Sequence, residues 1–200
     1  MRLVCLDLEG VLIPEVWIEM SLATGIPELQ RTTRDEPDYD KLMKFRLDLL
    51  EKNNLKLADI QQVIKGMQPL EGALEFANTL RERTQLVILS DTFDQFAGPL
   101  MAKLSWPTLF CNTLVTAADG AITGYKLRQN EGKKEAVKAF QSMNLRVFAA
   151  GDSFNDLAMI MQADAGCLFR APGTIRDNYP DIPCVDTFDR LMAEIEKFLR

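Results

Sequence analysis

The sequence of 200 residues contains no histidine. This absence excludes serine–histidine triads, histidine-ligated zinc and imidazole acid–base chemistry, so that any catalysis must use carboxylates, hydroxyls, lysine or arginine. Cysteine is scarce: the four residues Cys5, Cys111, Cys167 and Cys184 are widely scattered, and no close pair indicates a metal knuckle or a redox motif. We interpret them as reduced residues of the core.

Long apolar runs are also missing, since no stretch approaches the roughly 18 residues that a membrane span requires. The N-terminal "MRLVCLDL" is too short and too soon charged for a secretory signal, which favours a cytoplasmic enzyme. The net charge of -6 disfavours nucleic acid as a partner but leaves room for a small phosphorylated substrate bound by a few local cations. With 47% hydrophobic residues, the chain is long enough for one core and a smaller lobe.

Three short apolar runs are typical of parallel strands buried on both faces. They are "LVCL" before Asp7, "LVIL" before Ser90 and "VFAA" before Gly151 and Asp152. Helical patterns alternate with them, most clearly over 187–199 and less so over 72–83 and 133–143. Further strands are expected around 109–115, 165–169 and 182–186, with a hairpin turn at Asp119-Gly120. The alternation predicts a doubly wound α/β fold with a parallel sheet.

The stretch 14–71 departs from this alternation, because it carries helical patterns and no convincing strand. We interpret it as a small helical cap inserted after the first strand, with 1–13 and 72–200 forming the core. The turn-rich "RTTRDEPDYD" at 31–40 would be a loop inside the cap. The two lobes should meet over a cleft.

Open parallel sheets bind ligands beyond the carboxyl ends of their strands, where Asp7, Ser90 and Asp152 are predicted to lie. Each alone could simply end a strand or cap a helix, but all three follow the most apolar runs. Two carboxylates 4 Å apart repel by roughly 4 kcal/mol at an effective dielectric constant of 20, and oxygen ligands favour Mg²⁺ as the compensating cation. A cation, a hydroxyl and a lysine suit phosphoryl transfer, in which a carboxylate can be the nucleophile.

Four motifs then resemble those of the haloacid dehalogenase (HAD) superfamily, in order and in spacing: Asp7-Leu8-Glu9-Gly10-Val11, Ser90 after "LVIL", Lys133 in "NEGKKEAV", and "GDSFND" at 151–156. The run at 45–73 and the hairpin "DGAITG" are similar to the phosphoserine phosphatases of that superfamily. The Asp-x-Glu first motif and "LSDTFDQF" resemble the ThrH-type branch, whose members also pass phosphate to homoserine.

The resemblance implies a role for each matching residue. Asp7 would be the nucleophile and Glu9 the general acid and base, with Mg²⁺ held by Asp7, the backbone carbonyl of Glu9 and Asp152. Ser90 and Lys133 would hold phosphate oxygens.

Three further residues follow from the same resemblance. Asn155 would bind the phosphoryl group or orient Lys133, Asp156 would support the magnesium site from behind, and Asp91 would offer its amide beside the substrate. Lys134 is a rival for Lys133, because both lie in the same first helical turn; the motif register favours Lys133.

Arg46 falls in the centre of an apolar stripe on a helix predicted over 40–52, beside Leu42, Met43, Leu49 and Leu50. An internal acidic partner or snorkelling to the edge would explain it structurally. The functional alternative is a substrate α-carboxylate held by two hydrogen bonds. The resemblance implies that Glu15 receives the substrate ammonium, although a solvated acid at the hinge of the cap is the plainer alternative.

Two positions depart from ordinary phosphoserine phosphatases: Glu9 replaces an Asp, and Asp91-Thr92 replaces glycines that would let backbone amides approach a ligand closely. Our hypothesis is that Glu9 is compatible with a bulkier hydroxyl acceptor such as homoserine. We therefore expect a Mg²⁺-dependent phosphatase of O-phosphoserine that works through an aspartyl phosphate and also transfers the phosphoryl group to homoserine. The alternatives are a phosphatase of another small phosphomonoester, a phospho-acceptor module like a response-regulator receiver, and a non-catalytic binder of a phosphorylated metabolite.

Overall fold

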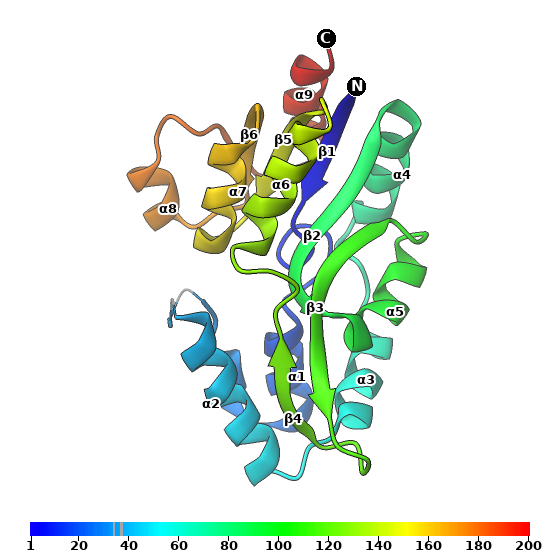
Figure 1. Ribbon diagram of the computed structural model, residues 1–200, viewed down its shortest axis with the longest axis vertical. Coiled ribbons are helices and arrows are strands. Elements are labelled where there is room, and N and C mark those ends of the chain that lie inside the picture. The colour runs from blue at the N-terminus through cyan, green and yellow to red at the C-terminus, as the bar shows by residue number, and fades with distance from the viewer. Residues whose placement is uncertain (34, 37) are drawn as a thin grey trace.

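The computed structural model describes residues 1–33, 35–36 and 38–200 (Figure 1). A seven-stranded sheet has the order β4-β3-β2-β1-β5-β6-β7, and every neighbouring pair is parallel except β3 with β4. The strands are β1 (Arg2–Leu6), β2 (Gln85–Phe93), β3 (Thr108–Thr116), β4 (Ile122–Lys126), β5 (Arg146–Gly151), β6 (Ala165–Phe169) and β7 (Cys184–Val185). The predicted doubly wound α/β fold is confirmed, and so is the hairpin at Gly120 (φ 85°) between β3 and β4.

Helices cover both faces of the sheet (Figure 1). One face carries α4 (Ala73–Arg83), α5 (Asp94–Lys103) and α9 (Phe188–Leu199), and the other carries α6 (Gly132–Ser142), α7 (Leu157–Gln162) and α8 (Gly173–Asn178). Along β1, Val4 and Leu6 join the first core while Leu3 and Cys5 join the second. Because alternate side chains point to opposite faces, burial of both faces explains the uninterrupted apolar run of this strand.

The chain between β1 and α4 forms helices and, in its described part, no named strand. These elements are α1 (Val16–Thr24), the short 3-10 helix η1 (Pro27–Gln30), α2 (Tyr39–Lys52) and α3 (Leu57–Gly66). They lie beside the β3–β4 hairpin, in the half of the molecule away from both termini (Figure 1). This placement supports the interpretation of 14–71 as a cap, whose boundaries stay a prediction.

The loop predicted at 31–40 is shorter than expected, because α2 already begins at Tyr39. The side chain of Asp38 caps this helix by accepting a hydrogen bond from the backbone N–H of Lys41 at 3.2 Å, which satisfies one of the free amides of the first turn. Arg34 and Pro37, which belong to the predicted loop, lie outside the described residues.

Strand β2 differs from its prediction, since it does not end before Ser90 but continues to Phe93. Its pairing with β1 stops at Ile88, and its register with β3 shifts between Leu89 and Phe93. The segment 90–92 therefore leaves the regular ladder, and its backbone groups are free to make other hydrogen bonds. Ser90 occupies this irregular segment rather than a strand end.

The four cysteines are free, and Cys5 and Cys167 are buried in the core as predicted. Cys111 and Cys184 are only half-buried, so the prediction of core positions is too strong for these two. Among the helices of the described residues, none has both the length and the apolar character that crossing a bilayer requires.

Candidate active site

A cavity lies where β1, β2 and β5 meet the helices α1 and α2. Core residues line one side and residues from the predicted cap line the other. The core contributes Asp7, Glu9, Asp91, Thr92, Phe93, Lys133, Asp152, Ser153 and Asn155, and the cap contributes Glu15, Trp17, Thr32, Thr33, Tyr39 and Arg46. The cleft expected between two lobes is thus present, at the edge of the sheet that the topology favours for ligand binding.

Asp7 follows β1 directly and has only 4% of its surface exposed. Its backbone N–H donates to the carbonyl of Ala150 at 3.0 Å, and its Oδ1 accepts from the N–H of Leu8 at 2.8 Å. Burial raises the pKa of this carboxyl, and the charge of Asp156 raises it further, while Lys133 opposes both effects. The carboxylate is therefore held in one orientation and depends on Lys133 for its charge.

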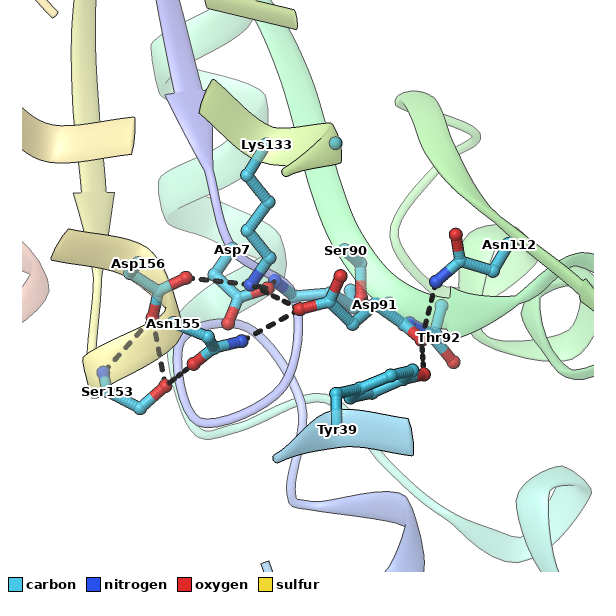
Figure 2. A network of polar contacts seen from close by, with 12 residues as sticks. Asp7, Tyr39, Ser90, Asp91, Thr92, Asn112, Lys133, Ser153, Asn155 and Asp156 are labelled. Carbon is cyan, nitrogen blue, oxygen red and sulfur yellow. Dashed lines mark hydrogen bonds and ion pairs between the residues drawn. The ribbon is translucent and has the colours of Figure 1, made fainter. Parts of the chain in front are cut away.

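Lys133 lies in the first turn of α6 and is buried among three carboxylates (Figure 2). Its Nζ lies 2.9 Å from Oδ1 of Asp7, 2.7 Å from Oδ1 of Asp156 and 3.7 Å from Oδ2 of Asp91. Burial alone would lower the pKa of this lysine, but the carboxylates hold it well above its ordinary value. Lys134 instead pairs with Glu131 nearer the surface, so the structure brings Lys133 rather than Lys134 into the cluster.

Asp156 belongs to the short 3-10 helix η2 (Phe154–Asp156) and is fully buried. Its Oδ2 accepts hydrogen bonds from the backbone N–H groups of Asp152 and Ser153, both at 3.0 Å, and lies 3.1 Å from the hydroxyl oxygen of Ser153. Its other oxygen contacts Lys133. Asp156 thereby fixes the turn that carries Asp152 and joins that turn to α6.

Asp7, Asp152 and Asp156 are all buried, and each offers a carboxylate oxygen within 4.8 Å of the others. Glycine is required next to them: Gly10 has φ 76°, and a Cβ at this position would lie 2.6 Å from the carboxyl group of Asp152. Three buried carboxylates exceed the charge of one lysine, and an all-oxygen donor set suits a hard divalent cation. These residues fit Mg²⁺, with Asp7 and Asp152 better placed as ligands because Asp156 already serves Lys133 and two amides.

The irregular segment of β2 supplies Ser90, Asp91 and Thr92. The Oγ of Ser90 accepts a hydrogen bond from the N–H of Thr92 at 3.1 Å. Oδ2 of Asp91 accepts from Nδ2 of Asn155 at 2.9 Å, and the hydroxyl of Ser153 in turn donates to Oδ1 of Asn155. Asp91 and Asn155 are thus linked to each other beside Lys133 (Figure 2).

Glu9 extends from the first motif to the start of α1. Its Oε2 accepts a hydrogen bond from the N–H of Val16, the first residue of that helix, at 2.9 Å. Burial raises the pKa of Glu9, and the Val16 hydrogen bond and the charge of Arg46 oppose this shift. The longer side chain thus joins the first motif to the first cap helix.

Arg46 is 6% exposed and has no ion-pair partner among the described residues. Its guanidinium lies 4.6 Å from the ring centroid of Trp17, its Nη2 donates to the carbonyl of Arg31 at 3.0 Å, and its Nε makes no hydrogen bond within the described part of the chain. Burial lowers the pKa of Arg46 to about 10, so it stays charged at neutral pH. Snorkelling is not seen in the described residues. The carboxylates of Glu9 and Glu15 act on the charge of Arg46 without lying at ion-pair distance, and a buried cation in this position can bind a further anion. Glu15 lines the same cavity.

Several residues of this cavity are not predicted as site residues from the sequence, and Tyr39 and Thr92 are two of them. The hydroxyl of Tyr39 donates to the carbonyl of Asp91 at 3.0 Å. Thr92 is 3% exposed, and its Oγ1 has no hydrogen-bond partner in the described residues. The sequence places Tyr39 in the loop predicted over 31–40 and marks Thr92 only as a departure from glycine, and no periodic pattern distinguishes either residue.

Comparisons with known proteins identify the family of this chain. A model of the haloacid dehalogenase-like hydrolases matches residues 1–164. A phosphoserine phosphatase from Pseudomonas syringae pv. tomato is 53% identical, covering 98% of this chain and 83% of the relative. The phosphoserine phosphatase ThrH from Pseudomonas aeruginosa is 52% identical and covers 98% of this chain and 96% of the relative.

The fold is also similar to solved structures. A phospho-aspartyl intermediate analogue of a phosphoserine phosphatase superposes with a TM-score of 0.79 at 24% sequence identity, covering 100% of this chain and 99% of the other. The resemblance drawn from the four motifs is confirmed: the chain belongs to the family of haloacid dehalogenase-like hydrolases.

Proposed function

We propose that the protein is a Mg²⁺-dependent phosphatase of O-phosphoserine that forms a phosphoryl-aspartate on Asp7 and also passes the phosphoryl group to homoserine. The observation that carries this proposal is the pairing, in one cavity, of a buried carboxylate held by Lys133 with a buried arginine that has no carboxylate at ion-pair distance in the described residues. The two relatives named as phosphoserine phosphatases support the choice of substrate.

In the first step, an oxygen of Asp7 attacks phosphorus and the bond from phosphorus to the serine oxygen breaks. Glu9 donates a proton to the departing oxygen; the raised pKa of this buried carboxyl favours the protonated form that the step needs. In the second step, the hydroxyl of water or homoserine attacks phosphorus and returns a proton to Glu9. Asp7 is released unchanged, so the reaction is a double displacement.

The phosphoryl group would be bound by Ser90, Lys133 and Asn155, which lie around the network in Figure 2. Asp7, Asp152 and the backbone carbonyl of Glu9 would hold Mg²⁺, with Asp156 behind them. When bound, this cation supplies positive charge that offsets the charge of the carboxylates and of the phosphoryl oxygens.

The amino-acid part of the substrate would be recognised from the cap side. Arg46 would bind the α-carboxylate through its guanidinium, and Glu15 would receive the ammonium group. Such recognition would distinguish an amino-acid phosphate from other small phosphomonoesters. A substrate without a carboxylate leaves the buried guanidinium of Arg46 without an anion, which costs binding free energy.

The direct test is to incubate the protein with phosphoserine and Mg²⁺, with and without homoserine, and to identify the products. We expect serine and inorganic phosphate, and phosphohomoserine when homoserine is present. Arg46→Lys should raise KM for phosphoserine by at least about tenfold, because the planar fork is lost, and should leave p-nitrophenyl phosphate hydrolysis within about twofold. Failure to release serine would overturn the substrate assignment.

The role of Glu9 in choosing the acceptor is tested by Glu9→Asp. The shorter side chain loses the reach to the Val16 amide, so a carboxylate displaced by about 1 Å is expected to lower kcat by about 100-fold. The partition of the phosphoryl group between water and homoserine should change at the same time. An unchanged partition would contradict the link between Glu9 and the acceptor.

A further inference from the structure

The backbone carbonyl of Asp91 accepts hydrogen bonds from two side chains that are distant in sequence (Figure 2). The hydroxyl of Tyr39 donates to it at 3.0 Å from α2, and Nδ2 of Asn112 donates at 3.2 Å from β3. Neither residue belongs to the four motifs. The carbonyl of Asp91, in the irregular part of β2, therefore accepts one hydrogen bond from the cap and one from the sheet. We call these two hydrogen bonds the clamp.

This clamp sets the direction of the next amide. Because a trans peptide is planar, the carbonyl of Asp91 and the N–H of Thr92 lie in one plane and point in opposite directions within it. That N–H donates to Oγ of Ser90 at 3.1 Å. Fixing the carbonyl thus fixes both the Thr92 amide and the hydroxyl that it contacts.

The two hydrogen bonds of the clamp, one arm from Asn112 and one from Tyr39, come from different parts of the fold. Oδ1 of Asn112 accepts from the N–H of Arg128, which leads into α6 and Lys133, so this arm belongs entirely to the core. Tyr39 is the first residue of α2, the same helix that carries Arg46. The tyrosine arm is therefore present only while α2 is docked against β2.

Local packing holds the tyrosine in place. Its ring lies edge-on to the ring of Tyr125 with centroids 5.8 Å apart, and the hydroxyl of Tyr125 donates to Oδ1 of Asp40 at 2.6 Å. Burial raises the pKa of Tyr39, which keeps its hydroxyl protonated as the donor that the carbonyl needs. Tyr125 makes a comparable bond to the same helix, but not to β2.

We propose that Tyr39 is a positioning residue, whose hydroxyl orients the Asp91–Thr92 peptide and so completes the phosphate-binding segment when α2 docks. The inference rests on the proposed function in that Ser90 binds a phosphoryl oxygen. It extends that function by making the phosphate site depend on the same helix that recognises the amino acid. A substrate that engages Arg46 then also assembles the segment that holds its phosphoryl group.

Tyr39→Phe tests the inference, because it removes the hydroxyl and keeps the ring. We expect kcat to fall about tenfold for both phosphoserine and p-nitrophenyl phosphate, and the inhibition constant of inorganic phosphate to rise by a similar factor. Tyr125→Phe is the matched control: it removes a hydroxyl that contacts α2 without touching β2, so both kcat values should stay within about twofold.

Two results would overturn the inference. One is an effect of Tyr39→Phe on KM for phosphoserine alone, which would make Tyr39 a wall of the amino-acid pocket. The other is unchanged kcat and phosphate inhibition. Should the wild-type protein hydrolyse p-nitrophenyl phosphate but not phosphoserine, the proposed substrate would fail while the tests with p-nitrophenyl phosphate and inorganic phosphate would still decide the role of Tyr39.

Discussion

Replacing Asp7 with asparagine is expected to lower the turnover of phosphoserine by about 10⁴-fold or more, with the fold intact. The substitution keeps the shape of a side chain that is 4% exposed, and the amide oxygen can still accept from the N–H of Leu8. It removes the nucleophilic oxygen, however, and removing a covalent nucleophile costs several orders of magnitude. Rates should be measured with phosphoserine, and the fold checked by circular dichroism.

Phosphoryl transfer to the protein itself is the sharper readout. Acid-quenched wild-type protein incubated with labelled phosphoserine should retain label, and Asp7→Asn should retain none. Asp91→Asn is the control, because Asp91 also faces Lys133 but does not carry the proposed phosphoryl bond; it should lose rate and still take up label. Label retained by Asp7→Asn would place the nucleophile elsewhere.

The sheet was predictable because its signal is local. The runs before Asp7 and Gly151 are apolar at every position, as burial of both faces requires, and they became β1 and β5. The run before Ser90 predicted the strand but not its irregular extension. That extension depends on hydrogen bonds from Tyr39 and Asn112, which lie 52 and 21 residues away from Asp91 in the sequence.

The sequence predicts those residues of the candidate site that directly follow an apolar strand or match one of the four motifs. Asp7, Lys133, Asp152 and Asp156 come together as expected, and the contacts of Lys133 and Lys134 agree with the motif register, which favours Lys133. The contact from Glu9 to Val16 required the fold, since it depends on how α1 turns back over the first motif. The unpartnered Nε of Arg46 likewise follows from tertiary packing, which a stripe on a helix does not specify.

Replacing Lys133 with methionine is expected to abolish measurable turnover and to lower the free energy of unfolding by about 3–5 kcal/mol in buffer without divalent cations. Lys133 is the cation in direct contact with Asp7 and Asp156, and both side chains are buried. Methionine fills a similar volume, so the loss would reflect charge rather than a cavity. Without the lysine, the carboxylates must repel one another or take up protons, and either response costs folding free energy. Denaturant unfolding measures the change.

Lys134→Met provides the matched control, because that lysine is one position away and pairs with Glu131 nearer the surface; its unfolding free energy should change by no more than about 0.5 kcal/mol. The same titrations repeated with Mg²⁺ separate charge compensation from packing. In Lys133→Met the carboxylates repel one another because no lysine offsets their charge. If Asp7 and Asp152 bind Mg²⁺, the cation removes this repulsion and should stabilise the variant more than the wild-type protein. If Mg²⁺ stabilises both proteins equally, Lys133 and Mg²⁺ do not offset the charge of the same carboxylates. Such a result would contradict the prediction and would mean that the lysine and the cation act on separate groups.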